Sequence, residues 1–374
     1  MPGSGKLSSA RRVVVKIGSS LLVDPRDGTI HRPWLDAMAD DVAMLRAQGQ
    51  EVVLVTSGAV ALGRRYLGLG TGVLRLDEKQ AAAAAGQIRL AHAYQESLAR
   101  HDITVAQVLL TIDDSENRRR YLNARGTLVT LLRLGAVPVI NENDTVATQE
   151  IRFGDNDRLA ARVAEMVVAD VLVLLSDIDG LYSHNPQTHA DALFVPEVTE
   201  LTPEIEAMAG APLSGHGSGG MVTKLLAARI CMGAGCRMVI APGRAMNPLR
   251  ALENGGRCTW FMPAAEPHTA RKRWIAGALR PCGAVVVDDG AVTALQTGRS
   301  LLPAGVVAVD GMFQRGDAIL IRDLAGRVVA KGLTAYSASD ALRIMGRKTI
   351  DIEPILGYWY RDELVHRDDM ALDP

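Results

Sequence analysis

The chain has 374 residues, of which 48% are hydrophobic and 22% charged, which is typical of globular proteins with a substantial core. Its 41 Lys and Arg residues nearly balance 42 Asp and Glu residues, so the formal net charge is −1. This balance argues against a general nucleic-acid or membrane-surface binder, although it leaves room for a local basic patch.

No hydrophobic run approaches the roughly 18 residues that a transmembrane helix needs, and residues 1–12 lack the apolar core of a signal peptide. The GSGK at 3–6 lacks the earlier glycine and the preceding strand of a Walker A loop, so we expect residues 1–10 to be a loose tail. None of the four cysteines lies in a C-x-x-C pair or in a Cys/His cluster with zinc spacing. These features favour a cytoplasmic protein with reduced, buried thiols.

Two sequence patterns alternate through the first 260 residues. Buried, β-branched runs predict strands at 13–17, 51–56, 103–110, 136–141, 170–176 and 237–243. Amphipathic spacing between them predicts helices at 33–48, 80–99, 120–134, 157–169 and 221–233. Repeated βα units imply a three-layer αβα domain with a mainly parallel sheet, in which ligands bind beyond the carboxyl ends of the strands.

The pattern changes after about residue 262. The stretch 263–280 begins with polar residues and two prolines and is interpreted as a linker. Short β-type runs, turns and a short helix near 337–345 predict a second, small, mostly β domain at 281–360, in which acidic and basic residues cancel. We expect domain boundaries at 1–262 and 281–360, with residues 361–374 as a C-terminal tail.

The stretch SGHGSGGMVTK at 214–224 matches the dinucleotide fingerprint G-x-G-x-x-G. However, no strand precedes it and no acidic residue ends the next strand, so the dinucleotide interpretation fails. A protein-kinase glycine loop fails too, because the chain has no metal-binding D-F-G. The remaining interpretations are a plain glycine-rich turn, or a phosphate site at the start of helix 221–233 with Lys224 one turn inside it.

Two further strand ends carry residues suited to anions. Lys16 lies near the end of an otherwise buried strand, so it either meets an anionic partner or extends its ammonium group to solvent. Ser57 and Gly58 follow the strand 51–56 and begin a helix, where Ser57 could simply cap the helix or the pair could bind an anion.

Polar residues also follow the strands at 136–141 and 170–176. Asn141, Glu142, Asn143, Asp144, Asp155, Asn156 and Asp157 could form a turn and a helix cap, hold an ammonium group, or organise lysines around a phosphoryl group. Ser176 and Asp177 stand where a ribose or a base could bind. Lysines, helix starts and carboxylates on one sheet edge are the parts that phosphoryl transfer requires.

Seven segments, in this order, resemble the amino acid kinase family, and in particular the branch that phosphorylates glutamate. They are VVVKIGSS, VTSGAVALGR, AAGQ at 84–87, VINENDTVAT, GDNDRLAA, LLSDIDGLY and GSGGMVTK. The resemblance covers nearly the whole chain, and residues 281–360 resemble a PUA domain. Departures are mild, since Ser176 and Ser218 stand where threonine is common and keep the hydroxyl group.

The resemblance implies transfer of the ATP γ-phosphoryl group to the γ-carboxylate of L-glutamate, the first step of proline biosynthesis. It implies that Lys16 and Lys224 contact the transferring group and that Asp157 orients both lysines. The residues implied for glutamate binding are Ser57, Gly58, Asp144 and Asn156. Those implied for ATP binding are Lys16, Gly18, Ser176, Asp177, Ser218, Gly219, Gly220, Met221, Val222, Thr223 and Lys224. Mg²⁺ would be carried by the nucleotide phosphates rather than by a protein site.

The resemblance further implies a homodimer or homotetramer, feedback inhibition by L-proline, and delivery of the product to a glutamyl-phosphate reductase. The sequence offers no obvious catalytic His or Cys, which agrees with a carboxylate acceptor that is already ionised at pH 7. Two alternatives stay open. One is another member of the family, such as an acetylglutamate or carbamate kinase, and the other is an RNA-binding protein acting through the PUA domain, which its balanced charge disfavours.

Overall fold

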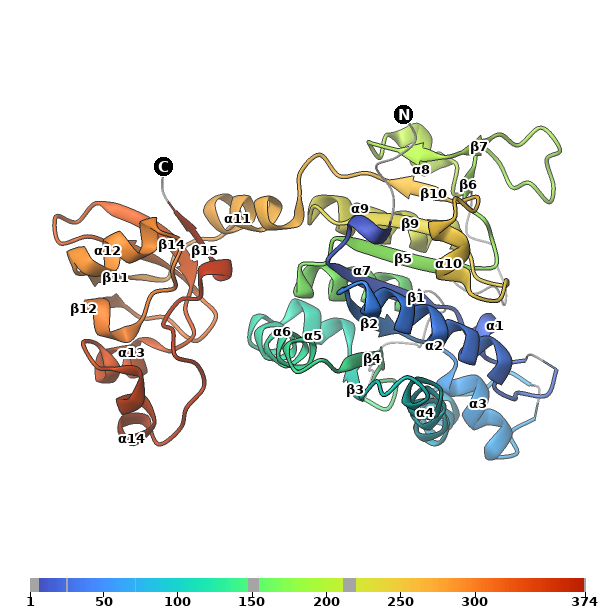
Figure 1. Ribbon diagram of the computed structural model, residues 1–374, viewed down its shortest axis with the longest axis horizontal. Helices are drawn as coiled ribbons and strands as arrows, with labels where there is room; N and C mark the ends of the chain where they lie inside the picture. The colour runs from blue at the N-terminus through green and yellow to red at the C-terminus, as the bar shows by residue number, and fades with distance from the viewer. Residues whose placement is uncertain (1–6, 25, 71, 147–154, 211–219, 373–374) are drawn as a thin grey trace. The chain divides into compact units, whose positions relative to one another are not determined.

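The structure is a computed structural model that describes residues 7–24, 26–70, 72–146, 155–210 and 220–372 (Figure 1). These fall into two compact units, Met1–Pro267 and His268–Pro374. Among the described residues, no helix combines the length and the apolar character needed to cross a bilayer.

The first unit is built on an eight-stranded sheet with the order β3-β4-β2-β1-β5-β9-β10-β8. Its strands are β1 (Arg12–Ile17), β2 (Glu51–Val55), β3 (Val105–Leu110), β4 (Val137–Glu142), β5 (Val171–Ser176), β8 (Glu197–Val198), β9 (Arg237–Pro242) and β10 (Thr259–Phe261). All neighbours pair in parallel except β9 and β10. The six predicted strands and the mainly parallel sheet are therefore confirmed. The strands β8 and β10, and the hairpin of β6 (Leu181–Tyr182) and β7 (Phe194–Val195), are too short to give a sequence pattern.

Helices cover both faces of this sheet (Figure 1). They are α1 (Ser19–Leu22), α2 (Arg32–Ala47), α3 (Ala59–Tyr66), α4 (Leu76–Ala99), α5 (Ile112–Glu116), α6 (Arg118–Arg133), α7 (Asp155–Val167), α8 (Pro203–Ala207), α9 (Met221–Gly233) and α10 (Pro248–Glu253). One hydrophobic core joins the sheet to α2 and α4, and a second core joins its other face to α6, α7 and α9. The three-layer αβα prediction is therefore correct.

The alternation of side chains along β1 decides which layer each residue meets. Val13, Val15 and Ile17 lie in the core on the α2/α4 face, whereas Val14 lies in the core on the α7/α9 face. Because successive side chains of a strand point to opposite faces, Lys16 shares the face of Val14. The strand thus directs a single cation toward α7 and α9.

Helices α3 and α4 touch backbone to backbone at two glycines. A Cβ added to Gly63 would lie 1.6 Å from the carbonyl oxygen of Ala82, and one added to Gly86 would lie 1.9 Å from that of Ala59. Neither approach is possible for a residue with a side chain, so the pair of glycines fixes how closely the two helices pack.

Replacing Gly63 with alanine is expected to destabilise the chain by about 3 kcal/mol, because α3 and α4 must separate to admit the new methyl group. Urea unfolding of the full chain measures the change. Gly233→Ala, at the end of α9 where no atom lies near the added Cβ, is the matched control and should change stability by less than about 1 kcal/mol. An equally small effect of Gly63→Ala would contradict the close packing.

The second unit contains a five-stranded sheet with the order β12-β11-β13-β14-β15. Its elements are α11 (Pro267–Ala278), β11 (Gly283–Val287), α12 (Asp289–Gln296), β12 (Val306–Gly311), β13 (Ala318–Arg322), β14 (Val328–Leu333), α13 (Ala338–Ile344), α14 (Ile352–Leu356) and β15 (Met370–Leu372). It has its own hydrophobic core. The four expected strands and the short helix near 337–345 are present.

The structure differs from the expected linker and tail at both ends of this unit. Most of 263–280 is the helix α11, and β15 adds a strand from the segment expected to be a tail. The guanidinium of Arg271 on α11 contacts the carboxylate of Asp369 at 2.6 Å, and both side chains are buried. This buried ion pair ties the two ends together, which polar composition alone could not reveal. Cys231 and Cys236 are buried as expected, whereas Cys258 is half-buried and Cys282 is exposed.

Candidate active site

The carboxyl ends of five neighbouring parallel strands meet at one edge of the large sheet. Lys16 of β1 is in register with Val55 of β2 and Leu174 of β5, and Ser176 of β5 is in register with Pro242 of β9. Residues that follow these strands are therefore neighbours at this edge, although they come from distant parts of the sequence. Such an edge is the usual ligand site of an α/β sheet.

Three charged side chains from three different elements converge there. The Nζ of Lys16 lies 2.7 Å from Oδ1 of Asp157, and the Nζ of Lys224 lies 3.1 Å from Oδ2 of the same carboxylate. The Oγ1 of Thr223 also donates a hydrogen bond to Oδ2, at 3.0 Å. The predicted meeting of the two lysines is confirmed, and the alternative in which Lys16 extends into solvent is wrong.

The three charged side chains are almost fully buried, so their electrostatic interactions are screened little by solvent. The Asp157 side chain is 1% exposed, and those of Lys16 and Lys224 are 11% and 8% exposed. Burial by itself would raise the pKa of the Asp157 carboxyl group, but the two ammonium groups outweigh burial and hold the pKa below its ordinary value of 3.8. Two ammonium groups therefore share this one carboxylate.

Local structure explains how each member reaches this point. Strand alternation aims Lys16 at α7, whose first turn carries Asp157. Helix α9 begins after Gly220, which occupies the N-cap position without any side-chain cap, so Thr223 and Lys224 lie in its first turn. The N-terminal end of the helix dipole adds to the positive character of the site.

The segment after β2 is built differently from the simple helix cap considered above. Gly58, not Ser57, is the N-cap of α3, and a glycine has no side chain with which to cap the helix. The φ angle of Gly58 is 103°, a left-handed conformation that favours glycine. The capping interpretation of Ser57 is therefore wrong, and its hydroxyl is not used for that purpose.

The structure places the other predicted site residues as follows. Ser176 ends β5, is buried, and donates to the exposed Asp177 at 3.1 Å. Asp144 is buried just beyond β4, and Asn156 lies beside Asp157 with a buried Oδ1 that accepts no hydrogen bond from the residues that the structure describes. Gly18 lies at the start of α1, after β1. Ser218 and Gly219 lie outside the described residues.

Two polar contacts at the same edge were not predicted. The hydroxyl groups of Thr56 and Tyr94 lie 2.9 Å apart, and Asn141 Nδ2 donates to Gln87 Oε1 at 2.8 Å. Thr56 directly follows β2 and Asn141 lies in β4, whereas both partners belong to α4. The sequence signal that could have drawn attention to Gln87 is its place at the end of the AAGQ segment, 84–87.

Comparison with known proteins identifies the fold and its relatives. The model of the amino acid kinase family matches residues 11–242, and that of the PUA domain matches residues 283–356. The chain belongs to the amino acid kinase family. Its relatives include proteins named "Glutamate 5-kinase" from Paramagnetospirillum magneticum, 66% identical over 98% of this chain and 99% of that one, and from Rhodospirillum rubrum, 64% identical over 96% of each. A solved isopentenyl phosphate kinase substrate complex aligns at 17% identity and a TM-score of 0.47, over 67% of this chain and 99% of that one.

Proposed function

We propose that the chain transfers the γ-phosphoryl group of ATP to the γ-carboxylate of L-glutamate, giving γ-glutamyl phosphate. The observation that carries this proposal is the buried contact of Lys16 and Lys224 with one carboxylate, Asp157, at the ligand edge of the sheet. Relatives 57–66% identical over most of the chain bear the name of this activity.

The main obstacle to the reaction is the repulsion between two anions. A glutamate side chain, with a pKa near ~4.3, is ionised at pH 7, so it attacks phosphorus without a general base. One of its oxygens forms the new bond to the γ-phosphorus while the bond to the ADP oxygen breaks. Lys16 and Lys224 stabilise the charge on the transferring group, and Asp157 holds both ammonium groups in place.

The two substrates would approach from different segments. On the acceptor side we assign Ser57, Gly58, Asp144 and Asn156, since these follow β2 and β4 or begin α7. On the nucleotide side we assign Ser176 and Asp177 together with Gly18 and the run 218–224. The ammonium groups and the N-terminus of α9 suit phosphate oxygens rather than a cation, so Mg²⁺ would be held by the ATP phosphates and would neutralise part of their charge.

An ATP-dependent hydroxamate assay with L-glutamate, N-acetyl-L-glutamate and carbamate tests the proposal. We expect turnover with L-glutamate and at least about 100-fold lower kcat/KM with the other two, because neither carries the free α-ammonium group of an amino acid. Preference for either of those acceptors would overturn it. The same assay with added L-proline tests the inhibition that we propose as part of this function. Size-exclusion chromatography, alone and with a glutamyl-phosphate reductase, tests the dimer or tetramer and the product transfer.

Replacing Asp144 with alanine is expected to raise the KM for glutamate about tenfold or more, because a buried carboxylate beyond β4 would no longer face the substrate ammonium group. The KM for ATP should stay within about twofold of wild type. Steady-state kinetics with each substrate varied in turn measures both. Asp191→Ala, which removes an exposed carboxylate in the same unit, is the control. An unchanged glutamate KM would refute the role of Asp144.

A further inference from the structure

The face of helix α4 that packs on the sheet is mostly apolar but carries two polar groups. Leu90, Tyr94 and Leu98 are almost fully buried in the core beneath the sheet. Gln87 lies three residues before Leu90 and seven before Tyr94, so helical periodicity puts it on the same face. This face thus carries two polar groups among apolar side chains, the amide of Gln87 and the hydroxyl of Tyr94.

These two polar side chains contact the ends of two neighbouring strands. Tyr94 bonds to the hydroxyl of Thr56, the residue after β2, at 2.9 Å. Gln87 accepts from the amide nitrogen of Asn141, near the end of β4, at 2.8 Å. Thr56 and Asn141 are 0% and 2% exposed, so neither can exchange its partner for water without local opening. One helix therefore holds both strand ends.

The geometry at Asn141 leaves little freedom. Its Oδ1 accepts from the backbone N–H of Glu142 at 2.9 Å, so its Nδ2 must face the Oε1 of Gln87. The chain then runs through Glu142 and Asn143 to Asp144, which is assigned above to glutamate. On the neighbouring strand, Thr56 leads directly into Ser57 and Gly58. Both acceptor-binding segments therefore start from a residue that α4 holds.

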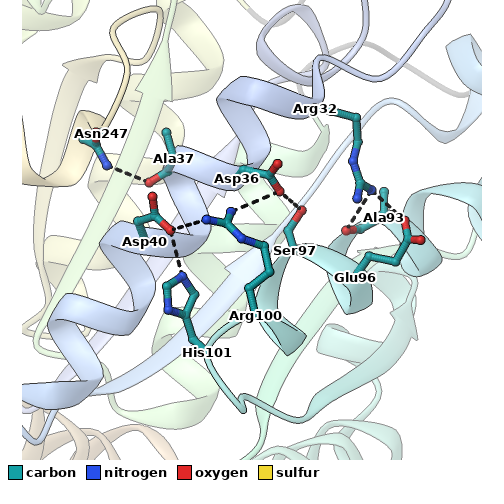
Figure 2. Close-up of polar contacts among 10 residues, drawn as sticks. All are labelled: Arg32, Asp36, Ala37, Asp40, Ala93, Glu96, Ser97, Arg100, His101 and Asn247. Atoms are coloured by element: carbon teal, nitrogen blue, oxygen red, sulfur yellow. Dashed lines mark hydrogen bonds and ion pairs between the residues drawn. The ribbon is translucent and has the colours of Figure 1, made fainter.

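Helix α4 is itself fixed near its middle and at its C-terminal end, as a support of this kind requires. Near Gln87, the backbone of Gly86 touches α3. At the C-terminal end, Ser97 donates to Asp36 of α2 at 2.7 Å, and His101, just after α4, contacts Asp40 at 2.7 Å (Figure 2). Figure 2 shows that further contacts, from Arg32 to Glu96 and from Arg100 to both aspartates, join the same helices.

We propose that Gln87 is a positioning residue for the acceptor half of the site. By orienting Asn141, it sets the course of the segment that carries Asp144, and it thereby tunes affinity for the amino acid but not for the nucleotide. This inference rests on the proposed function. It also explains the AAGQ motif, because Gly86 allows the close packing of α3 and Gln87 contacts Asn141 near the end of β4.

The test compares three variants at position 87 with wild type, varying glutamate and ATP separately. Gln87→Met keeps the size but loses the acceptor, and it should raise the glutamate KM about tenfold with the ATP KM within about twofold and kcat within about threefold. Gln87→Glu keeps an acceptor oxygen at the same reach, and its glutamate KM should stay within about threefold of wild type. In Gln87→Asn the side chain is one methylene too short to reach Asn141, so its glutamate KM should rise as in Gln87→Met. This variant still tests the inference if Gln87→Met folds poorly.

Ile88→Ala, at the adjacent and 74% exposed position of α4, is the matched control and should leave both KM values unchanged. Equal rises in the KM for glutamate and ATP, or no rise in Gln87→Met and Gln87→Asn, would overturn the inference. Failure of Gln87→Glu to restore the glutamate KM would do the same. If the wild-type protein phosphorylates glutamate in this assay, the proposed function stands whatever the variants do. If it does not, both the proposed function and the role of Gln87 are refuted.

Discussion

Replacing Lys224 with alanine is expected to lower kcat by about 100- to 1,000-fold while the KM for glutamate changes by less than about threefold. The reason is that Lys224 would stabilise charge on the phosphoryl group as it transfers, not the bound amino acid. The fold should survive, because Asp157 keeps its contact with Lys16 at 2.7 Å. Steady-state kinetics and a thermal melt of the same preparation measure both expectations.

The control for this prediction is Lys272→Ala, which removes an exposed lysine of α11 and should leave kcat unchanged. Lys224→Arg is informative as well, since it keeps the charge but replaces a compact ammonium with a planar guanidinium. We expect it to recover only part of the lost rate. A near-wild-type kcat in Lys224→Ala would remove this residue from the mechanism.

Replacing Asp157 with alanine is expected to destabilise the chain by about 3–5 kcal/mol, because the two buried ammonium groups would lose the carboxylate that they share. Activity should fall with it. Added ATP should raise the melting temperature of this variant more than that of wild type, because phosphate would supply the missing negative charge. Equal shifts in both proteins would contradict the idea that the lysines face the nucleotide.

The stabilising effect of Asp157 should depend on pH in one direction. Its pKa is lower in the folded chain than the ordinary 3.8, so the unfolded chain takes up the proton first as the pH falls. The contribution of this group is fully present above about pH 4 and is lost as the pH falls through the folded-state pKa. The difference in unfolding free energy between wild type and Asp157→Ala should therefore be constant near neutrality and shrink below about pH 4. A difference that grew on acidification would contradict this sign.

Much of the fold and part of the site could be predicted because the signals are local. The six long strands stand out as β-branched runs, and Lys16 is conspicuous because a lone cation is costly in such a run. Lys224 is conspicuous because it follows a glycine run at a helix start. The sheet edge then brings the two together by topology alone.

What could not be predicted depends on contacts between distant segments. Nothing near Tyr94 in the sequence indicates that its hydroxyl meets Thr56, and the alanine-rich surroundings of Gln87 do not point to Asn141. The ion pair that joins α11 to the end of the chain spans almost a hundred residues. The pairing of Gly63 with α4 is equally hidden, because a glycine in a helix looks merely unfavourable until its neighbour is known.

The two faces of the large sheet carry different tasks under this mechanism. Asp157 and Lys224 come from the layer of α7 and α9, and Lys16 of β1 points toward that layer. The supports of the amino-acid pocket come from α4 on the opposite side of the sheet. Changes in α4 could then alter which acid is accepted while the phosphate chemistry is left untouched. Substitutions in α4 are therefore the place to begin when the acceptor specificity is to be changed by protein engineering.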